Sequence, residues 1–280
     1  MTRIIRIAHS PDSDDAFMFY ALAAGKLDTG DIRYVHELAD IETLNRRALS
    51  GELEVSAVSI HAYAYLADRY ALLGSGASMG DGYGPRLVAR EPAPSDPQRG
   101  LKGRRVAVPG LRTTAYLALK LYQPEIEPVV LPFDRIGAAI AGGEVEVGLL
   151  IHEGQLTFAD EGFQLWQDLG AWWKGETGLP LPLGGNVVRR DLGTKLIARI
   201  AHDLRTSIEY GLAHRAPALV HASQYSRGLS GAATDEFVGM YVNQWTVDYG
   251  PRGRRAVQLL LDQGSEAGVI PHAVKVEFVS

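Results

Sequence analysis

A proline-rich segment, residues 91–100 (EPAPSDPQRG), separates two series of alternating strand and helix patterns in this chain. The segment has three prolines and no apolar periodicity, so we expect a surface connection. Short apolar strand patterns alternate with helix patterns from Arg3 onward, and a fresh series of the same kind begins at Arg105. This alternation is typical of an α/β fold.

The rest of the chain, from about residue 190 to Gly268, has only helical patterns and no strands to form a core of its own. We therefore expect this helical tail to pack on the first series. The prediction is a two-lobed α/β fold, with a discontinuous first lobe of residues 1–90 plus 190–280 and an inserted second lobe of residues 91–189. The chain would cross near Leu87–Arg90 and Asn186–Arg190, and a cleft between such lobes is a preferred site for small molecules.

Local patterns add three expectations. The apolar run after Ser59 predicts a helix over residues 61–70, and Asp134 is expected to cap a helix that runs to Ala141. Three tryptophans in residues 158–173 are interpreted as core rather than as a wall against a flat ligand; they are Trp166, Trp172 and Trp173.

One histidine stands where a ligand would be bound. Residues 145–151 form an apolar run of strand length, and His152 follows at its carboxyl end. Ligands of open α/β sheets bind just beyond the carboxyl ends of the strands, and an imidazole there can act as a general base near neutral pH. A surface histidine is the more common occupant of such a position, so the case for His152 depends on its neighbours.

Polar groups at other strand ends converge with His152. In the first lobe, the Ser10–Asp15 turn has more polar side chains than one helix cap needs, and Ser59 follows another strand, although a cap is favoured for Ser59 by itself. In the second lobe, Thr113 and Thr114 start a helix and can cap it or hold a carboxylate, with the free N–H of Ala115 adding to such a site. We predict that His152 is the base, with Asp14 and Asp15 as secondary contacts.

Composition excludes several classes of function. The net charge of −5 is scattered, which argues against a nucleic-acid or membrane partner, and the absence of cysteine excludes thiolate metal sites and a cysteine nucleophile. Residues 76–80 (GASMG) fit the G-x-S-x-G elbow of serine hydrolases, but residues 81–85 (DGYGP) cannot open the helix that the elbow needs. Residues 1–7 do not suit a signal peptide, and no run could cross a bilayer. We expect a cytoplasmic protein with a small carboxylate ligand and without metal or cofactor.

Several stretches also carry a family resemblance. The most specific are residues 150–153 (LIHE), 168–173 (DLGAWW) and 177–184 (TGLPLPLG), and further matches run nearly end to end. On these residues the chain resembles the 1,4-dihydroxy-6-naphthoate synthase family of the futalosine route to menaquinone. The resemblance implies a fold like that of the type II periplasmic binding proteins.

The resemblance also implies an activity and a set of site residues. It implies a cofactor-free lyase that acts on cyclic dehypoxanthinyl futalosine, with His152 as proton acceptor. The family's substrate contacts fall here on Ala57, Val58, Ser59, Thr114 and Ala115.

Two parts of the chain, the first turn and position 57, depart from the family pattern. The first turn of related sequences reads Ser-Pro-Cys-Pro-Asn-Asp-Thr-Phe, whereas this chain has Asp12, Ser13, Asp14 and Ala16 at the positions that differ. Position 57 is a lysine in some relatives, and Arg112 is a candidate for its role as a carboxylate partner.

Two alternatives remain. Chorismate dehydratase, the sister enzyme of the same pathway, is disfavoured by residues 152–153 and 172–173. A non-catalytic cytoplasmic protein that captures a carboxylate would use the same cleft without chemistry. The absence of an export signal weakens that alternative without removing it.

Overall fold

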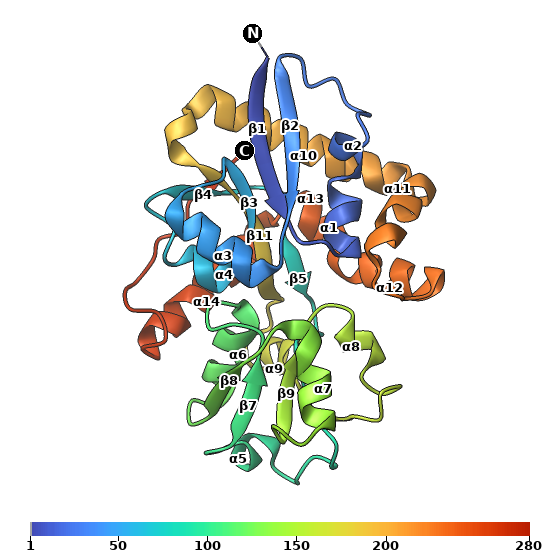
Figure 1. Ribbon diagram of the computed structural model, residues 1–280. Coiled ribbons are helices and arrows are strands. Elements are labelled where there is room, and N and C mark those ends of the chain that lie inside the picture. Colours follow the sequence, from blue (N-terminus) through green and yellow to red (C-terminus); the bar gives the residue numbers. More distant parts are fainter. Residues whose placement is uncertain (1) are drawn as a thin grey trace.

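Two β-sheets, one above the other in Figure 1, organise the chain, of which the computed structural model describes residues 2–280. The upper sheet has the order β12–β4–β11–β3–β1–β2, with β5 paired to β11. Its strands are β1 Arg3–His9, β2 Ile32–Leu38, β3 Val55–Ser59, β4 Tyr70–Leu73, β5 Ser78–Gly80, β11 Leu181–Arg189 and β12 Phe278–Val279. Strands β2 and β3 run parallel to β1, whereas β11 is antiparallel to β3 and β4.

The lower sheet has the order β10–β6–β9–β7–β8. Its strands are β6 Arg86–Ala89, β7 Arg105–Val108, β8 Glu127–Val130, β9 Val147–Leu150 and β10 Gln164–Asp168. Strand β7 is parallel to β8 and β9, and β6 is antiparallel to β9 and β10. The helices around this sheet are α5 Pro97–Gly100, α6 Thr114–Tyr122, the 3₁₀ turn η1 Phe133–Arg135, α7 Ile136–Ala141, α8 Gly154–Thr157 and α9 Leu169–Thr177.

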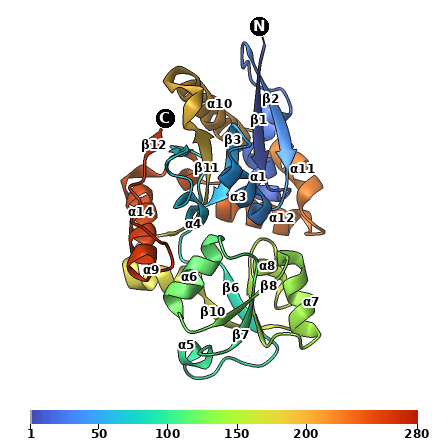
Figure 2. The same cartoon turned by 60° about the vertical axis from the view of Figure 1, so that its left-hand side comes forward.

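The remaining helices surround the upper sheet, which also carries both chain ends (Figures 1 and 2). They are α1 Ser13–Met18, α2 Tyr20–Ala23, α3 Ile41–Ser50, α4 Ile60–Tyr63, η2 Arg190–Leu192, α10 Thr194–Ala213, α11 Arg215–Ala222, η3 Ser223–Tyr225, α12 Gly231–Tyr241, α13 Gln244–Val247 and α14 Gly250–Glu266. The helical tail packs on the first series: Ile200 and Leu204 of α10 share a buried cluster with Ile5 and Ile7 of β1. Within residues 2–280, no helix is both long and apolar enough to span a membrane.

The α/β prediction is confirmed, and the sheets define where the chain passes between them. Strand β6 pairs in the lower sheet although residues 86–89 lie in the range predicted for the first lobe. Strand β11 pairs in the upper sheet although residues 181–189 lie in the range predicted for the second. We propose that the lobes divide within residues 81–85 and 169–180 rather than at residues 90 and 190.

Two local expectations were wrong. The helix predicted over residues 61–70 ends at Tyr63, because Tyr70 begins the buried strand β4 and pairs with Arg189 of β11. Asp134 caps no helix, since it lies inside the 3₁₀ turn that precedes α7. The tryptophan expectation held: Trp166 and Trp173 are buried in the core, and Trp172 packs against the same cluster.

Buried histidines make the stability of this fold sensitive to acid. Burial lowers the pKa of His9 and of His61 to about 4 in each case. The unfolded chain binds these protons below its ordinary pKa of about 6.5, so the stabilisation is complete above pH 6.5 and is lost as the pH falls towards 4. We expect the free energy of unfolding to decrease over this interval by on the order of 3 kcal/mol per histidine.

Urea unfolding between pH 7 and pH 4.5 measures this effect. His61→Gln keeps a donor for the carbonyl of Thr113, which His61 Nδ1 contacts at 3.2 Å, but cannot titrate. Its unfolding free energy should therefore change less with pH than that of the wild type. If the unfolding free energies of the two proteins had the same pH dependence, His61 would not contribute to the acid sensitivity.

Candidate active site

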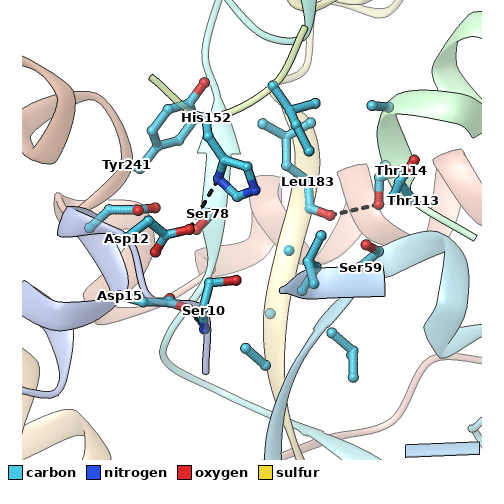
Figure 3. Close-up of a pocket in the computed structure, with 18 of the residues that line it drawn as sticks. Ser10, Asp12, Asp15, Ser59, Ser78, Thr113, Thr114, His152, Leu183 and Tyr241 are labelled. Carbon is cyan, nitrogen blue, oxygen red and sulfur yellow. Dashed lines mark hydrogen bonds and ion pairs between the residues drawn. The ribbon is translucent and has the colours of Figure 1, made fainter. Parts of the chain in front are cut away.

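A cavity of about 740 Å³, part of it open to solvent, lies between the two sheets where several strands reach their carboxyl ends. Strands β1 and β3 lead into it from the upper sheet, and β7 and β9 from the lower one. All nine residues predicted for the site line this cavity: Asp14, Asp15, Ala57, Val58, Ser59, Thr113, Thr114, Ala115 and His152. Figure 3 shows His152 facing Asp12 on one side and Ser59, Thr113 and Thr114 on the other.

His152 has an unusual backbone conformation. It lies just beyond β9 with a φ of 55°, in the left-handed region that histidine adopts only occasionally. Gln155 supports this conformation: with its amide oriented so that both ends are satisfied, its oxygen accepts from the N–H of His152 at 3.2 Å and its nitrogen donates to Gly84 at 2.6 Å. Gln155 also contacts the hydroxyl of Tyr241. Sequence reasoning did not single out Gln155 or Tyr241, because neither belongs to a recognisable motif.

Asp12 forms the closest polar contact of the histidine ring. His152 Nδ1 lies 3.0 Å from Asp12 Oδ2, and the Asp12 side chain is only 3% exposed. Burial alone would raise the pKa of Asp12, but the hydrogen bond and charge of His152 outweigh burial and hold that pKa below its usual range. Asp12 stands at the N-cap position of α1, but its side chain makes no cap hydrogen bond to that helix.

Two further carboxyl groups lie beside Asp12. Burial, with the charges of Asp12 and Asp15, raises the pKa of Asp14 well above its ordinary value. Burial and the charge of Asp12 likewise raise the pKa of Asp15, against the bond from the Ser10 N–H at 2.8 Å. Oxygens of the three carboxyls lie within 4.8 Å of one another, so among the described residues these are the ones that could hold a metal ion.

Glu153 does not contact the ring of His152. Its Oε2 instead pairs with Arg227 Nη1 at 3.1 Å, and Arg227 Nη2 donates to the carbonyl of Pro11 at 3.1 Å. The same guanidinium lies over the ring of Phe133, which packs edge-on against His152. Arg227 therefore ties the loop before α12 to the region around His152, a role that no pattern in the sequence indicates.

The opposite side of the cavity suits an anion. The sequence favoured a helix cap for Ser59, but its side chain makes no cap bond to α4. Its Oγ instead accepts a hydrogen bond from Asn45 Nδ2 at 3.1 Å, which leaves its O–H available to a ligand. The N–H groups of Thr114 and Ala115 have no acceptor among the described residues, because they open helix α6. Aligned N–H groups at a helix start favour a carboxylate.

The two threonines serve mainly to build this end of the cavity. Thr113 caps α6 by accepting from the N–H of Tyr116 at 3.2 Å, as expected. Thr114 Oγ1 donates to Leu183 at 2.6 Å and accepts from the N–H of His61 at 3.1 Å, so its hydroxyl is already engaged. Its contribution to ligand binding is therefore its backbone N–H.

Ala57 and Val58 form part of the wall, and Ser10 of the predicted Ser10–Asp15 turn also lies on it. Ser78 and Asn186 line the wall too, although the sequence analysis did not assign them to the site. Ser78 begins strand β5, in agreement with the rejection of a hydrolase elbow. Arg112 is not part of the lining; its guanidinium lies over the ring of Tyr65, so it does not replace a lysine at position 57.

Comparisons with known proteins agree with this geometry. A family model described as menaquinone biosynthesis matches residues 5–266. A Thermus thermophilus protein named 1,4-dihydroxy-6-naphthoate synthase is 42% identical over 98% of this chain and 99% of its own length. The chain belongs to the 1,4-dihydroxy-6-naphthoate synthase family. A second synthase of this family, from Streptomyces coelicolor, is 36% identical over 95% of both chains. The chain is accordingly an enzyme of menaquinone biosynthesis.

Solved structures extend the comparison to the fold. A protein of Archaeoglobus fulgidus is 46% identical, with a TM-score of 0.91 over 95% of this chain and 98% of its own. The alkanesulfonate-binding protein of Xanthomonas axonopodis, solved with MOPS bound, has a TM-score of 0.70 at 15% identity and covers 99% of this naphthoate synthase family member and 97% of its own chain. The periplasmic-binding-protein-like fold predicted from the resemblance is confirmed.

Proposed function

We propose that this enzyme is a carbon–carbon lyase that converts cyclic dehypoxanthinyl futalosine into 1,4-dihydroxy-6-naphthoate, with His152 as general base. The observation that carries the proposal is the position of His152 in the cavity: Nδ1 is engaged by Asp12, and the other ring nitrogen faces the side where Ser59 and Thr113 lie (Figure 3). A base must lie within hydrogen-bond reach of the proton it removes, and the direction of Nε2 towards the cavity supports this role. Membership of the synthase family supports the choice of substrate.

The anion-binding end would fix the substrate relative to the base. The substrate carboxylate would accept hydrogen bonds from Ser59 Oγ and from the N–H groups of Thr114 and Ala115. Such bonds hold the reacting carbon in one orientation, which converts a bimolecular proton transfer into an intramolecular one. The surrounding wall, including Ala57, Val58 and Leu183, is largely apolar and would strengthen these bonds where the bound substrate displaces water.

The proposed chemistry needs one base. His152 Nε2 takes a proton from the substrate, and the electron pair left behind forms a new π bond as the carbon–carbon bond breaks. The electron pair of the broken bond goes to the other fragment, which takes the proton back from Nε2, so that a small fragment leaves and an aromatic ring forms. Aromatisation supplies the driving force, so the chain's task is to place a base and to hold a carboxylate. We propose that no cofactor takes part, and the cytoplasmic location predicted from the sequence remains part of this proposal.

Turnover of cyclic dehypoxanthinyl futalosine by the purified protein tests the proposal. We expect 1,4-dihydroxy-6-naphthoate as product, at the same rate before and after dialysis against EDTA. A rate that falls with EDTA and returns with a divalent cation would make the carboxyls of Asp12, Asp14 and Asp15 a metal site. Dehydration of chorismate instead would establish the sister enzyme, and binding of a carboxylate without turnover of either compound would establish a capture protein.

A further inference from the structure

The contact between Asp12 and His152 joins residues that are 140 positions apart and belong to different sheets. Asp12 lies in the turn between β1 and α1, and His152 follows β9 of the other sheet. Their side chains are 3% and 17% exposed, and Nδ1 and Oδ2 are 3.0 Å apart. A carboxylate that is buried in this way and does not cap its own helix is held for another purpose.

We propose that Asp12 is the positioning residue of the base: it accepts the Nδ1–H of His152, leaves Nε2 unprotonated towards the substrate, and stabilises the imidazolium that forms after proton transfer. The inference rests on the proposed function of His152 as base. A neutral imidazole carries one N–H, and a carboxylate at Nδ1 selects the tautomer whose lone pair lies on Nε2. During the step the substrate proton moves to Nε2, the Nδ1–H stays on nitrogen, and Asp12 remains ionised.

Among the carboxyl groups near the His152 ring, Asp12 is the one that can offer the ring a negative charge. Asp14 and Asp15 lie beside it, and burial favours their protonated forms by raising the pKa of each. Glu153 is occupied by Arg227, which also neutralises part of the charge around Asp12. Tyr241 also lines the cavity, and burial raises its pKa, so it stays neutral. Phe133 packs edge-on against the His152 ring and brings no charge to it.

The first test compares kinetics of Asp12→Asn with the wild type. The asparagine keeps the shape but removes the charge and can turn an N–H towards Nδ1, which favours the wrong tautomer. We expect kcat to fall on the order of 100-fold with KM changed by less than about threefold. The acid limb of the kcat/KM profile should move to lower pH by roughly one unit, because the imidazolium loses its anionic partner.

Asp134→Asn is the matched control. Asp134 is an exposed carboxylate in the same turn as Phe133. Its substitution removes a negative charge from the neighbourhood of His152 without changing a group that touches the ring. Both kcat and the acid limb should stay at their wild-type values. Equal losses in the two variants would reduce the effect of Asp12 to general electrostatics and overturn the positioning role.

The second test does not depend on turnover. Nitrogen NMR of protein labelled with ¹⁵N-histidine distinguishes protonated from unprotonated ring nitrogens, and His152→Gln assigns the signals. We expect the Nδ1–H tautomer in the wild type and a shift towards the Nε2–H tautomer in Asp12→Asn. An Nε2–H tautomer in the wild type would by itself overturn the proposal, even if the variant fails to fold. If the wild type has the Nδ1–H tautomer but does not turn over cyclic dehypoxanthinyl futalosine, the lyase proposal fails while the hydrogen bond between Asp12 and His152 is supported.

Discussion

His152→Gln is expected to lower kcat for cyclic dehypoxanthinyl futalosine by about three orders of magnitude. General bases contribute on the order of 10²- to 10⁴-fold, and no other neutral base faces the same part of the cavity among residues 2–280. Glutamine retains the size and a hydrogen bond towards Asp12, so the loss reports the missing base rather than a collapsed site. Steady-state kinetics of the purified variant measure it.

Two controls separate catalysis from folding and binding. His202→Gln changes an exposed histidine of helix α10 and should leave kcat unchanged. A carboxylate product analogue should bind His152→Gln about as tightly as the wild type, because the proposed anion contacts come from Ser59 and the start of α6. Turnover within a few-fold of wild type would remove His152 from the mechanism and direct attention to Asp14 and Asp15.

Gly170→Ala is expected to destabilise the protein by about 3 kcal/mol or more. Gly170 opens helix α9, where a Cβ would lie 1.9 Å from the carbonyl oxygen of Tyr83 and 2.6 Å from the nitrogen of Gly84. Both contacts are with backbone, which cannot rotate aside. The Leu169 N–H also donates to Pro85 at 2.9 Å, so the two segments are held together at the passage between the sheets.

Gly175→Ala on the same helix is the matched control. Nothing lies within 4 Å of a Cβ at Gly175, so alanine should be neutral or stabilise α9 by up to about 1 kcal/mol through its higher helix propensity. Thermal unfolding of both variants beside the wild type measures the difference. Similar melting temperatures for the two variants would show that the backbone contact at Gly170 carries no stability.

Local patterns in the sequence were enough to predict the strand and helix series, the cap at Thr113 and the position of His152. Each depends on residues close together in the chain, such as an apolar run followed by a polar turn. Strand β11 is harder to locate from the sequence, because the extended pattern is clear only from Val187 onward while the strand begins at Leu181. The proline and glycines in its first half are uncommon in strands, so no local pattern predicts a strand there. Pairing with β3 and β5 stabilises it.

The partners of the predicted site residues could not be obtained in this way. The pairing of Asp12 with His152 and the bridge from Arg227 to Glu153 depend on how the two sheets face each other. The sequence favoured a helix cap for Ser59 because local geometry permits one. The packing of the two sheets determines that the side chains of Asp12 and Ser59 face the cavity.

The left-handed backbone conformation of His152 bears on which residues related chains can carry at this position. A side chain other than glycine costs about 1–3 kcal/mol in such a conformation, so folding alone would favour glycine at this position. If His152 is the base, the reaction and not the fold requires a histidine there. In a lineage that retained the cleft only to capture a ligand, drift would replace this residue early, while Ser59 and the start of α6 would persist. Glycine at position 152 of a related chain would therefore mark descent without the reaction.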